Sequence, residues 1–272
     1  MSVELSLLGK ETNYPTTYQP EILFPISRAP AREQYADIEG IYKGKDWWHV
    51  FEISWLNLKG IPQVAIGRIT LPASSANLIE SKSLKLYFNS MNFTAFESSE
   101  AFIATVEKDL SQAAQAHVTL TLFQVDELDI AKPQGICIDD QQPERLVDHP
   151  NASLLALDKN DLNDSVEVQL YSHLLRSNCP VTGQPDWGTV FIRYQGKKPC
   201  YRSVLAYIIS YRQHNGFHEQ CVEQIFADIW QNLKPEKLMV YAAYTRRGGL
   251  DINPCRVSDE TWMPSPIRLA RQ

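Results

Sequence analysis

Apolar and polar positions divide the first half of the chain into segments with the period of a strand or of a helix. β-branched and aromatic residues predict two strands, one on each side of the turn signal Gly60-Ile61-Pro62. Apolar residues at helical spacing then predict two amphipathic helices, and apolar residues alternating with threonines predict a further strand. The predicted elements are strands at 47–56 and 64–71, helices at 84–91 and 103–110, and a strand at 117–125.

The second half of the chain repeats this order of elements. Its predicted elements are strands at 166–170 and 188–194, helices at 204–211 and 222–233, a strand at 237–244 and one further strand after it. Residues 135–164 are rich in Asp, Asn and Pro without sustained periodicity, so they are interpreted as a connector between the halves. The residues up to Arg32 are rich in Pro and Tyr and predict an irregular arm.

Two short motifs recur in the same order in both halves, which indicates an internal duplication. Lys82-Ser83-Leu84 stands 120 residues before Arg202-Ser203-Val204, and Leu128-Asp129-Ile130 stands 122 residues before Leu250-Asp251-Ile252. A repeat of this length is too long for a solenoid. The sequence therefore predicts two tandem α+β domains, residues 1–150 and 151–272.

Composition excludes several classes of protein. The 272 residues carry 26 basic and 32 acidic side chains, a formal net charge of −6, with 44% hydrophobic and 21% charged residues, which is ordinary for a globular protein. The sequence shows no run of about 18 apolar residues and no secretory signal at its start, so we expect a soluble, cytoplasmic protein without a membrane partner. An acidic chain is poorly suited to coat phosphate backbones, so the expected partner is a small molecule and not a nucleic acid.

The five cysteines are an odd number without any C-x-x-C pair, and they fit neither a disulfide framework nor a zinc site. We expect them to be reduced, and we expect no metal. Cys179 stands out because it lies in the polar segment 177–188, whose two prolines and two glycines predict a loop before a strand. Asp186 follows seven residues later. A nucleophilic thiol with a nearby acid is one interpretation, and a buried turn cysteine is an equally weighted alternative.

Three other polar motifs could carry chemistry. His218 and Glu219 stand at the start of the strongest predicted helix, where helix capping is the alternative interpretation. Glu80-Ser81-Lys82 starts the corresponding helix of the first half, where a surface charge pair is the alternative. Arg247-Gly248 follows the strand at 237–244 and suits a phosphate, because guanidinium binds phosphate bidentately; a solvated turn is the alternative. No dinucleotide-binding G-x-G-x-x-G after a strand and no P-loop motif occurs.

The candidate residues are distributed unequally between the two halves. Cys179 and His218-Glu219 lie in the second half, and the first half has Ser98-Ser99 in place of the His-Glu pair. Conversely, the second half has Cys200-Tyr201-Arg202 in place of Glu80-Ser81-Lys82. A single composite site built from two diverged copies explains this pattern better than two independent sites.

Four separated motifs stand at residues 80–87, 177–187, 217–223 and 244–254. In this order they closely resemble the NADPH-dependent 7-cyano-7-deazaguanine reductases, the nitrile reductases of queuosine biosynthesis. Leu8-Gly9-Lys10-Glu11-Thr12 and Tyr18-Gln19-Pro20 match as well. The resemblance therefore covers nearly the whole chain and is to the long, two-module type of the family.

The resemblance implies two tandem tunnelling-fold modules, each an antiparallel sheet with two helices, an NADPH cofactor and a homodimer. It also implies a four-electron reduction of the nitrile of 7-cyano-7-deazaguanine, a deazapurine, to 7-aminomethyl-7-deazaguanine through a covalent thioimide. The implied catalytic residues are Cys179 as the nucleophile and Asp186 as the proton donor. The implied binding residues are Ile79, Glu80, Ser81, His218 and Glu219 for the substrate, and Ser81, Lys82, Arg247 and Gly248 for NADPH.

Three other functions are alternatives to this interpretation. A nitrilase-like hydrolase would also use a cysteine, a glutamate and a lysine, and would release acid and ammonia without consuming NADPH. A zinc-dependent tunnelling-fold enzyme of the cyclohydrolase kind is disfavoured because the sequence offers no ligand set. A purine- or pterin-binding scaffold, or a tRNA-binding module, would have no reactive thiol.

Overall fold

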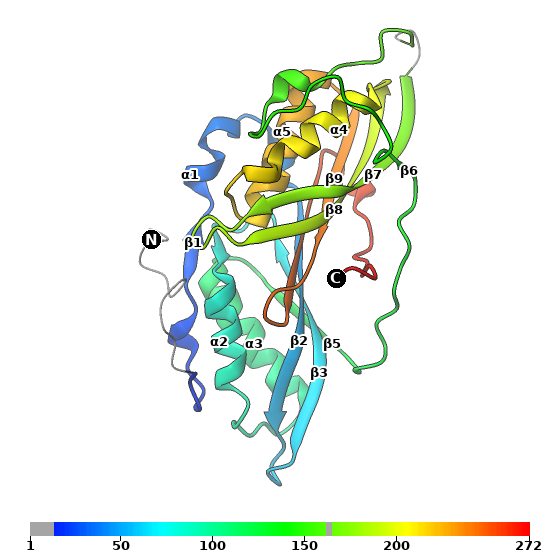
Figure 1. The fold of residues 1–272 in the computed structure, drawn as a ribbon. Coiled ribbons are helices and arrows are strands. Elements are labelled where there is room, and N and C mark those ends of the chain that lie inside the picture. The colour runs from blue at the N-terminus through cyan, green and yellow to red at the C-terminus, as the bar shows by residue number, and fades with distance from the viewer. Residues whose placement is uncertain (1–13, 162–164) are drawn as a thin grey trace. The chain divides into compact units, whose positions relative to one another are not determined.

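The computed structural model describes residues 14–161 and 165–272 (Figure 1), so the motif Leu8-Gly9-Lys10-Glu11-Thr12 lies outside the described residues. The chain forms two compact units. Of the described residues, unit 1 comprises 14–33, 46–129 and 246–252, and unit 2 comprises 34–45, 130–161, 165–245 and 253–272.

The division of the chain into these units differs from the predicted division, which had a single boundary at residue 150. Each unit still holds one of the two predicted sets of strands and helices. Residues 34–45, however, belong to unit 2, and residues 246–252 belong to unit 1. The difference arises because two strands, Gly44–Leu56 and Leu250–Val257, each continue from one unit into the other.

Unit 1 consists of a small sheet with two longer helices. Its elements are β1 (Pro25–Ser27), α1 (Ala29–Arg32), β2 (Gly44–Leu56), β3 (Pro62–Pro72), β4 (Asn77–Ile79), α2 (Ser81–Ser90), α3 (Ser99–Ala114) and β5 (Thr119–Phe123). The main sheet has the order β5-β3-β2, followed by the first residues of β10 (Leu250–Val257). β3 and β5 are antiparallel, and β1 and β4 form a separate antiparallel pair.

The helices of unit 1 form where the apolar period predicts them. Ser98 caps α3, because its side chain accepts a hydrogen bond from the Ala101 N–H at 3.2 Å. On the buried face of α3, Phe102 stacks on Trp55 of β2 with ring centroids 4.5 Å apart. Val106 and Leu110, one and two turns further along, are fully buried. The apolar stripe is therefore what attaches this helix to the sheet.

Unit 2 repeats the arrangement with longer strands. Its elements are β6 (Ile136–Cys137), β7 (Ser165–Asn178), β8 (Pro185–Lys197), α4 (Tyr201–Ile209), α5 (His218–Leu233), β9 (Lys237–Tyr244) and the end of β10. The strand order is β10-β9-β8-β7-β6. All neighbouring strands of unit 2 are antiparallel except β6 and β7, which are parallel.

Short 3₁₀ helices occur in both units. They lie at Pro20–Ile22, Glu33–Tyr35, Glu39–Tyr42, Ala152–Leu154, Ser210–Gln213 and Glu260–Trp262.

The segment 34–45 completes the core of unit 2. Tyr35, Ile38 and Ile41 belong to the same buried cluster as the apolar face of α5. Gly40 permits close approach, because a Cβ atom at this position would lie 2.4 Å from the ring of Phe226 on α5. The core of unit 2 therefore depends on residues that precede most of unit 1 in the sequence.

Every strand and helix predicted by residue range is found, and the α+β prediction is confirmed. The further strand expected after 237–244 is β10. Leu128-Asp129-Ile130, the first-half match to the first residues of β10, forms no strand. Asp129 is exposed and Ile130 is 60% exposed, so this stretch has no apolar face to bury against a sheet.

Candidate active site

A hairpin between β7 and β8 carries Cys179. Strand pairing continues to its very end, because Asn178 lies opposite Pro185 in the antiparallel register. The loop predicted for 177–188 is therefore too long, and only residues 179–184 lie between the two strands. Pairing across two long strands overrides the tendency of the prolines to interrupt regular structure, since Pro185 occupies the first position of its strand.

Main-chain hydrogen bonds close the hairpin around Cys179. The Cys179 N–H donates to the Gln184 carbonyl at 2.9 Å, and the Gly183 N–H donates to the Cys179 carbonyl at 3.0 Å. Gly183 has a φ of 67°, in the left-handed region that favours glycine. Cys179 is 5% exposed. The backbone of the hairpin thus fixes the position of the thiol.

Asp186 and His218 form a buried pair near this hairpin. Asp186 Oδ1 of β8 lies 3.3 Å from Nε2 of His218, the first residue of α5. The His218 ring stacks on Tyr244, the last residue of β9, with centroids 4.0 Å apart and an interplanar angle of 25°. Glu219, in the first turn of α5, is also buried. The two side chains are within ion-pair distance when the imidazole is protonated.

The hairpin is joined to the start of α5 by backbone hydrogen bonds. The Asn178 N–H donates to the His214 carbonyl at 2.8 Å, and the Gly216 N–H donates to the Asn178 carbonyl at 3.1 Å. Asn178 directly precedes Cys179, and Gly216 stands two residues before His218. Within unit 2, the structure therefore brings Cys179, Asp186, His218 and Glu219 into one continuous piece of hydrogen-bonded backbone.

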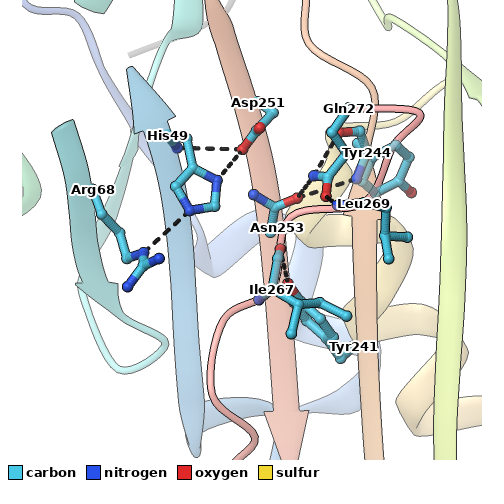
Figure 2. Close-up of polar contacts among 9 residues, drawn as sticks. All are labelled: His49, Arg68, Tyr241, Tyr244, Asp251, Asn253, Ile267, Leu269 and Gln272. Atoms are coloured by element: carbon cyan, nitrogen blue, oxygen red, sulfur yellow. Dashed lines mark hydrogen bonds and ion pairs between the residues drawn. The ribbon is translucent and has the colours of Figure 1, made fainter. Parts of the chain in front are cut away.

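The main chain of Tyr244 is held by two amide side chains of unit 2 (Figure 2). The Tyr244 N–H donates to Asn253 Oδ1 at 3.2 Å. Gln272 Nε2 donates both to Asn253 Oδ1 at 2.7 Å and to the Tyr244 carbonyl at 3.1 Å. These contacts fix the end of β9, and with it the ring on which His218 stacks.

A second buried Asp–His pair lies in unit 1 (Figure 2). His49 Nδ1 is 2.7 Å from Asp251 Oδ1, and Arg68 Nε donates to His49 Nε2 at 3.1 Å. Because a guanidinium only donates, His49 Nε2 accepts, and Nδ1 carries the hydrogen that is donated to Asp251. Both ring nitrogens are engaged by protein groups, so this pair is suited to a structural role.

Cys221, a second buried cysteine near the start of α5, is not suited to act as a nucleophile. Burial raises the pKa of the Cys221 thiol to about 12, so this thiol stays protonated and is a poor nucleophile at neutral pH. Cys221 is fully buried and Cys255 likewise, whereas Cys137 is exposed and Cys200 is half-buried. Cys179 is the cysteine of the site hairpin.

In unit 1, Glu80 is a buried helix cap and not the surface charge pair of the alternative interpretation. It is 1% exposed, and its carboxylate accepts hydrogen bonds from the Lys82 N–H at 2.6 Å and the Ser83 N–H at 2.8 Å. Burial raises the pKa of Glu80, and these two N–H donors oppose that effect. Ile79 is buried as the last residue of β4, and Ser81 begins α2.

The predicted cofactor residues Arg247 and Gly248 form a tight turn in unit 1. Arg247 and Leu250 exchange hydrogen bonds of 2.8 and 3.2 Å across the two central glycines. Gly248 and Gly249 have φ angles of 57° and 79°, which is the geometry of a type I′ turn. A Cβ atom at Gly248 would lie 2.8 Å from Nζ of Lys85 on α2. The turn therefore lies beside a lysine.

Sequence reasoning missed Lys85 and Tyr244. Lys85 stands three residues after the predicted cofactor residue Lys82, so the two lysines share one side of α2. This helical spacing was the signal that could have identified Lys85. Nothing local to Tyr244 indicates that its ring stacks on His218. The expectation that one composite site combines residues from both halves stays a prediction.

Within residues 14–161 and 165–272, no group of three or more His, Cys, Asp or Glu residues could hold a metal ion. Within the same ranges, no helix combines the length and the apolar character that crossing a bilayer requires.

Two family models match the chain. Residues 14–122 match the N-terminal domain of 7-cyano-7-deazaguanine-reductase, a nitrile reductase, and residues 185–262 match the family of QueF-like proteins. One match lies in each half of the chain, in agreement with the predicted duplication. The fold and these matches define a nitrile reductase with two tandem tunnelling-fold modules.

Curated relatives match over their whole length. An NADPH-dependent 7-cyano-7-deazaguanine reductase of Acinetobacter baumannii (strain ATCC 17978) is 81% identical, with 100% of both chains covered. The enzymes of the same name from Acinetobacter baylyi and Psychrobacter cryohalolentis are 77% and 52% identical, again with 100% of both chains covered. The chain belongs to the family of NADPH-dependent 7-cyano-7-deazaguanine reductases. The predicted family, and with it an oxidoreductase that depends on NADPH, is confirmed.

Proposed function

We propose that this protein reduces the nitrile of 7-cyano-7-deazaguanine to the primary amine of 7-aminomethyl-7-deazaguanine, with NADPH as the reductant, in queuosine biosynthesis. The observation that supports this most directly is the hairpin that fixes Cys179 together with the buried Asp186–His218 pair. A nitrile carbon is a weak electrophile, so its reduction benefits from a nucleophile and a positioned acid.

In the first proposed step, the Cys179 thiolate adds to the nitrile carbon. A C–S bond forms, one π bond of the nitrile breaks, and its electron pair moves to nitrogen. Asp186 supplies the proton that this nitrogen takes up, and His218 lies 3.3 Å from the carboxyl group that gives it up. The product of the step is a thioimide attached to Cys179.

NADPH supplies two hydrides, one per molecule of cofactor, which together carry the four electrons of the reduction. Between the hydride transfers the C–S bond breaks and Cys179 leaves as a thiolate, and with the second transfer the nitrogen takes up a second proton to become the amine. The residues of unit 1 fit the phosphates of such a cofactor. Lys82 and Arg247 provide cationic side chains, Ser81 provides a hydroxyl, and Gly248 lies in the exposed turn beside Lys85.

Glu80 is suited to bind the deazaguanine. The pyrimidine ring of this base carries N–H donors, and a carboxylate has about four acceptor positions. The helix cap of α2 uses two of them, so the remaining positions can accept hydrogen bonds from the base. In this proposal Ile79, Ser81, His218 and Glu219 are the other residues that bind the base.

The reaction is tested by incubating the full-length protein with 7-cyano-7-deazaguanine and NADPH. We expect two NADPH to be consumed for each amine formed. Formation of the acid and ammonia without NADPH consumption would instead identify a hydrolase, and no conversion at all would favour a binding scaffold. The cytoplasmic location, the homodimer and the absence of direct nucleic-acid binding stay predictions.

We expect Arg247 to bind the 2′-phosphate that distinguishes NADPH from NADH. A lost charge-assisted hydrogen bond costs about 1.5–3 kcal/mol, so Arg247→Ala should raise the KM for NADPH about 10- to 150-fold and change the KM for NADH much less. Steady-state kinetics with both cofactors measures the difference. Arg246→Ala is the matched control, because Arg246 is exposed and stacks on Phe51. Equal weakening of both cofactors by Arg247→Ala would contradict this role.

A further inference from the structure

Three arginines of unit 2 gather around one exposed indole. The guanidinium carbons of Arg176, Arg212 and Arg271 lie 5.4, 5.4 and 5.6 Å from the ring centroid of Trp187. They come from β7, from the 3₁₀ helix after α4, and from the segment after β10. We call this group the arginine cluster. Because all three charges lie close to one ring, they are within about one Debye length of each other and repel.

The arginine cluster contains no internal counter-charge. Among the described residues, Arg176, Arg212 and Arg271 form no ion pair with a carboxylate. Other arginines of the chain do, as in the pairs Arg193–Glu167 and Arg256–Glu223. Among the described residues, therefore, no carboxylate lies within ion-pair distance of these three guanidinium groups, and a bound anion would offset their repulsion.

Main-chain contacts hold the guanidinium groups of Arg176 and Arg271 in place and leave most of their donors available. Arg176 Nη1 donates to the Arg212 carbonyl, and Arg271 Nη1 donates to the His173 carbonyl at 2.8 Å. Each guanidinium has five N–H donors, so one hydrogen bond to a carbonyl orients the group and leaves its other N–H donors for a ligand. Such pre-oriented donors are what binding of a phosphate group requires.

A ligand-sized pocket adjoins the cluster. Its volume is about 610 Å³, and Arg176 and Arg212 line it together with Ile209 and residues 146–149. The carboxylate of Asp148 also lines the pocket, where it lies 3.1 Å from His149 Nδ1. This volume lies within the range of about 300–1,000 Å³ that is typical of small-molecule sites.

The arginine cluster is separate from the residues of the proposed reaction. Trp187 directly follows Asp186 on β8, and successive side chains of a strand point to opposite faces. Asp186 is buried, while Trp187 is 37% exposed. A ligand can therefore reach the arginine cluster without passing the Cys179 thiol.

We propose that the arginine cluster binds the phosphate group of a small phosphorylated ligand in the adjoining pocket. Planar guanidinium groups bind phosphate oxygens bidentately, and the pocket leaves room for the rest of the ligand. The phosphate could belong to a dinucleotide or to a different small molecule, and these two sources are distinguished by the test.

The test titrates the full-length protein with inorganic pyrophosphate at constant ionic strength, using calorimetry and tryptophan fluorescence. We expect saturable binding that weakens about tenfold or more in Arg176→Ala and in Arg212→Ala. Trp187→Phe should lose the fluorescence change and keep the calorimetric signal. Arg193→Ala is the matched control, because Arg193 also stacks on an indole, that of Trp262 at 4.1 Å, but is paired with Glu167. Thermal melts check that each variant is folded.

NADP⁺ serves as the second probe. Displacement of pyrophosphate by NADP⁺ that is lost in Arg176→Ala would assign the phosphate to a dinucleotide, and a lack of displacement would assign it to another phosphorylated molecule. Absence of saturable pyrophosphate binding would overturn the proposal. So would binding that Arg193→Ala weakens as much as Arg176→Ala does.

Discussion

Replacing Cys179 by alanine is expected to abolish turnover, lowering kcat by about 10⁶-fold, the loss seen when a catalytic nucleophile is removed. The variant should also fail to form a covalent adduct with 7-cyano-7-deazaguanine. Without the thiol no C–S bond can form, and hydride transfer would have to occur directly to an unactivated nitrile. Mass spectrometry of the intact protein after incubation with the nitrile measures the adduct.

The remaining cysteines are the controls for this experiment. Alanine variants at Cys137, Cys200, Cys221 and Cys255 should each keep the adduct. Cys221 is the most informative of them, because burial raises its thiol pKa to about 12 and leaves it protonated at neutral pH. An adduct that persists in Cys179→Ala, or one that disappears in Cys221→Ala with the fold intact, would contradict the proposed nucleophile.

Asp186→Asn is expected to lower kcat by about 10²- to 10⁴-fold, the usual contribution of a positioned acid, with little change in the affinity for the deazaguanine. Negative charge develops on the nitrile nitrogen as the thiolate adds, and an amide cannot deliver a full proton to it. Single-turnover kinetics and equilibrium binding of the base separate the two effects.

Asp228→Asn is the matched control for Asp186→Asn. Asp228 is also a buried aspartate of unit 2, and its Oδ2 accepts a hydrogen bond from the Tyr207 hydroxyl at 2.5 Å. It should cost stability and spare the chemical step. If Asp186→Asn behaves in the same way, with a lower Tm and normal turnover, then Asp186 only stabilises the hairpin.

The fold was predictable where local periodicity coincides with burial. The stripe that contains Val106 and Leu110 predicts α3, and both residues are fully buried. The unit boundary was not predictable, because the apolar residues of 34–45 have no helical or strand period that would assign them to α5. The tripeptide Leu128-Asp129-Ile130 resembles the start of β10, but sequence similarity over three residues does not determine whether they are buried.

The site was predictable as motifs and not as contacts. Cys179 and His218 could be selected from composition and from the start of a helix, and the resemblance to the reductase family assigned their roles. The stacking of His218 on Tyr244 joins residues that are 26 positions apart in sequence but 4.0 Å apart in space, which no local pattern shows. Glu80 was open to interpretation as a surface residue because only tertiary packing buries it.

The interleaving of the two units along the chain determines when each can fold during synthesis. The core of unit 1 includes Leu250 and Ile252, and the core of unit 2 includes Tyr35 and Ile41. A ribosome that adds about 5–20 residues per second needs about 10–40 s to pass from Ile41 to the end of α5 at Leu233. Throughout this time the apolar side chains of 35–41 lack the helix against which they pack. The nascent chain therefore exposes apolar side chains that the finished protein buries.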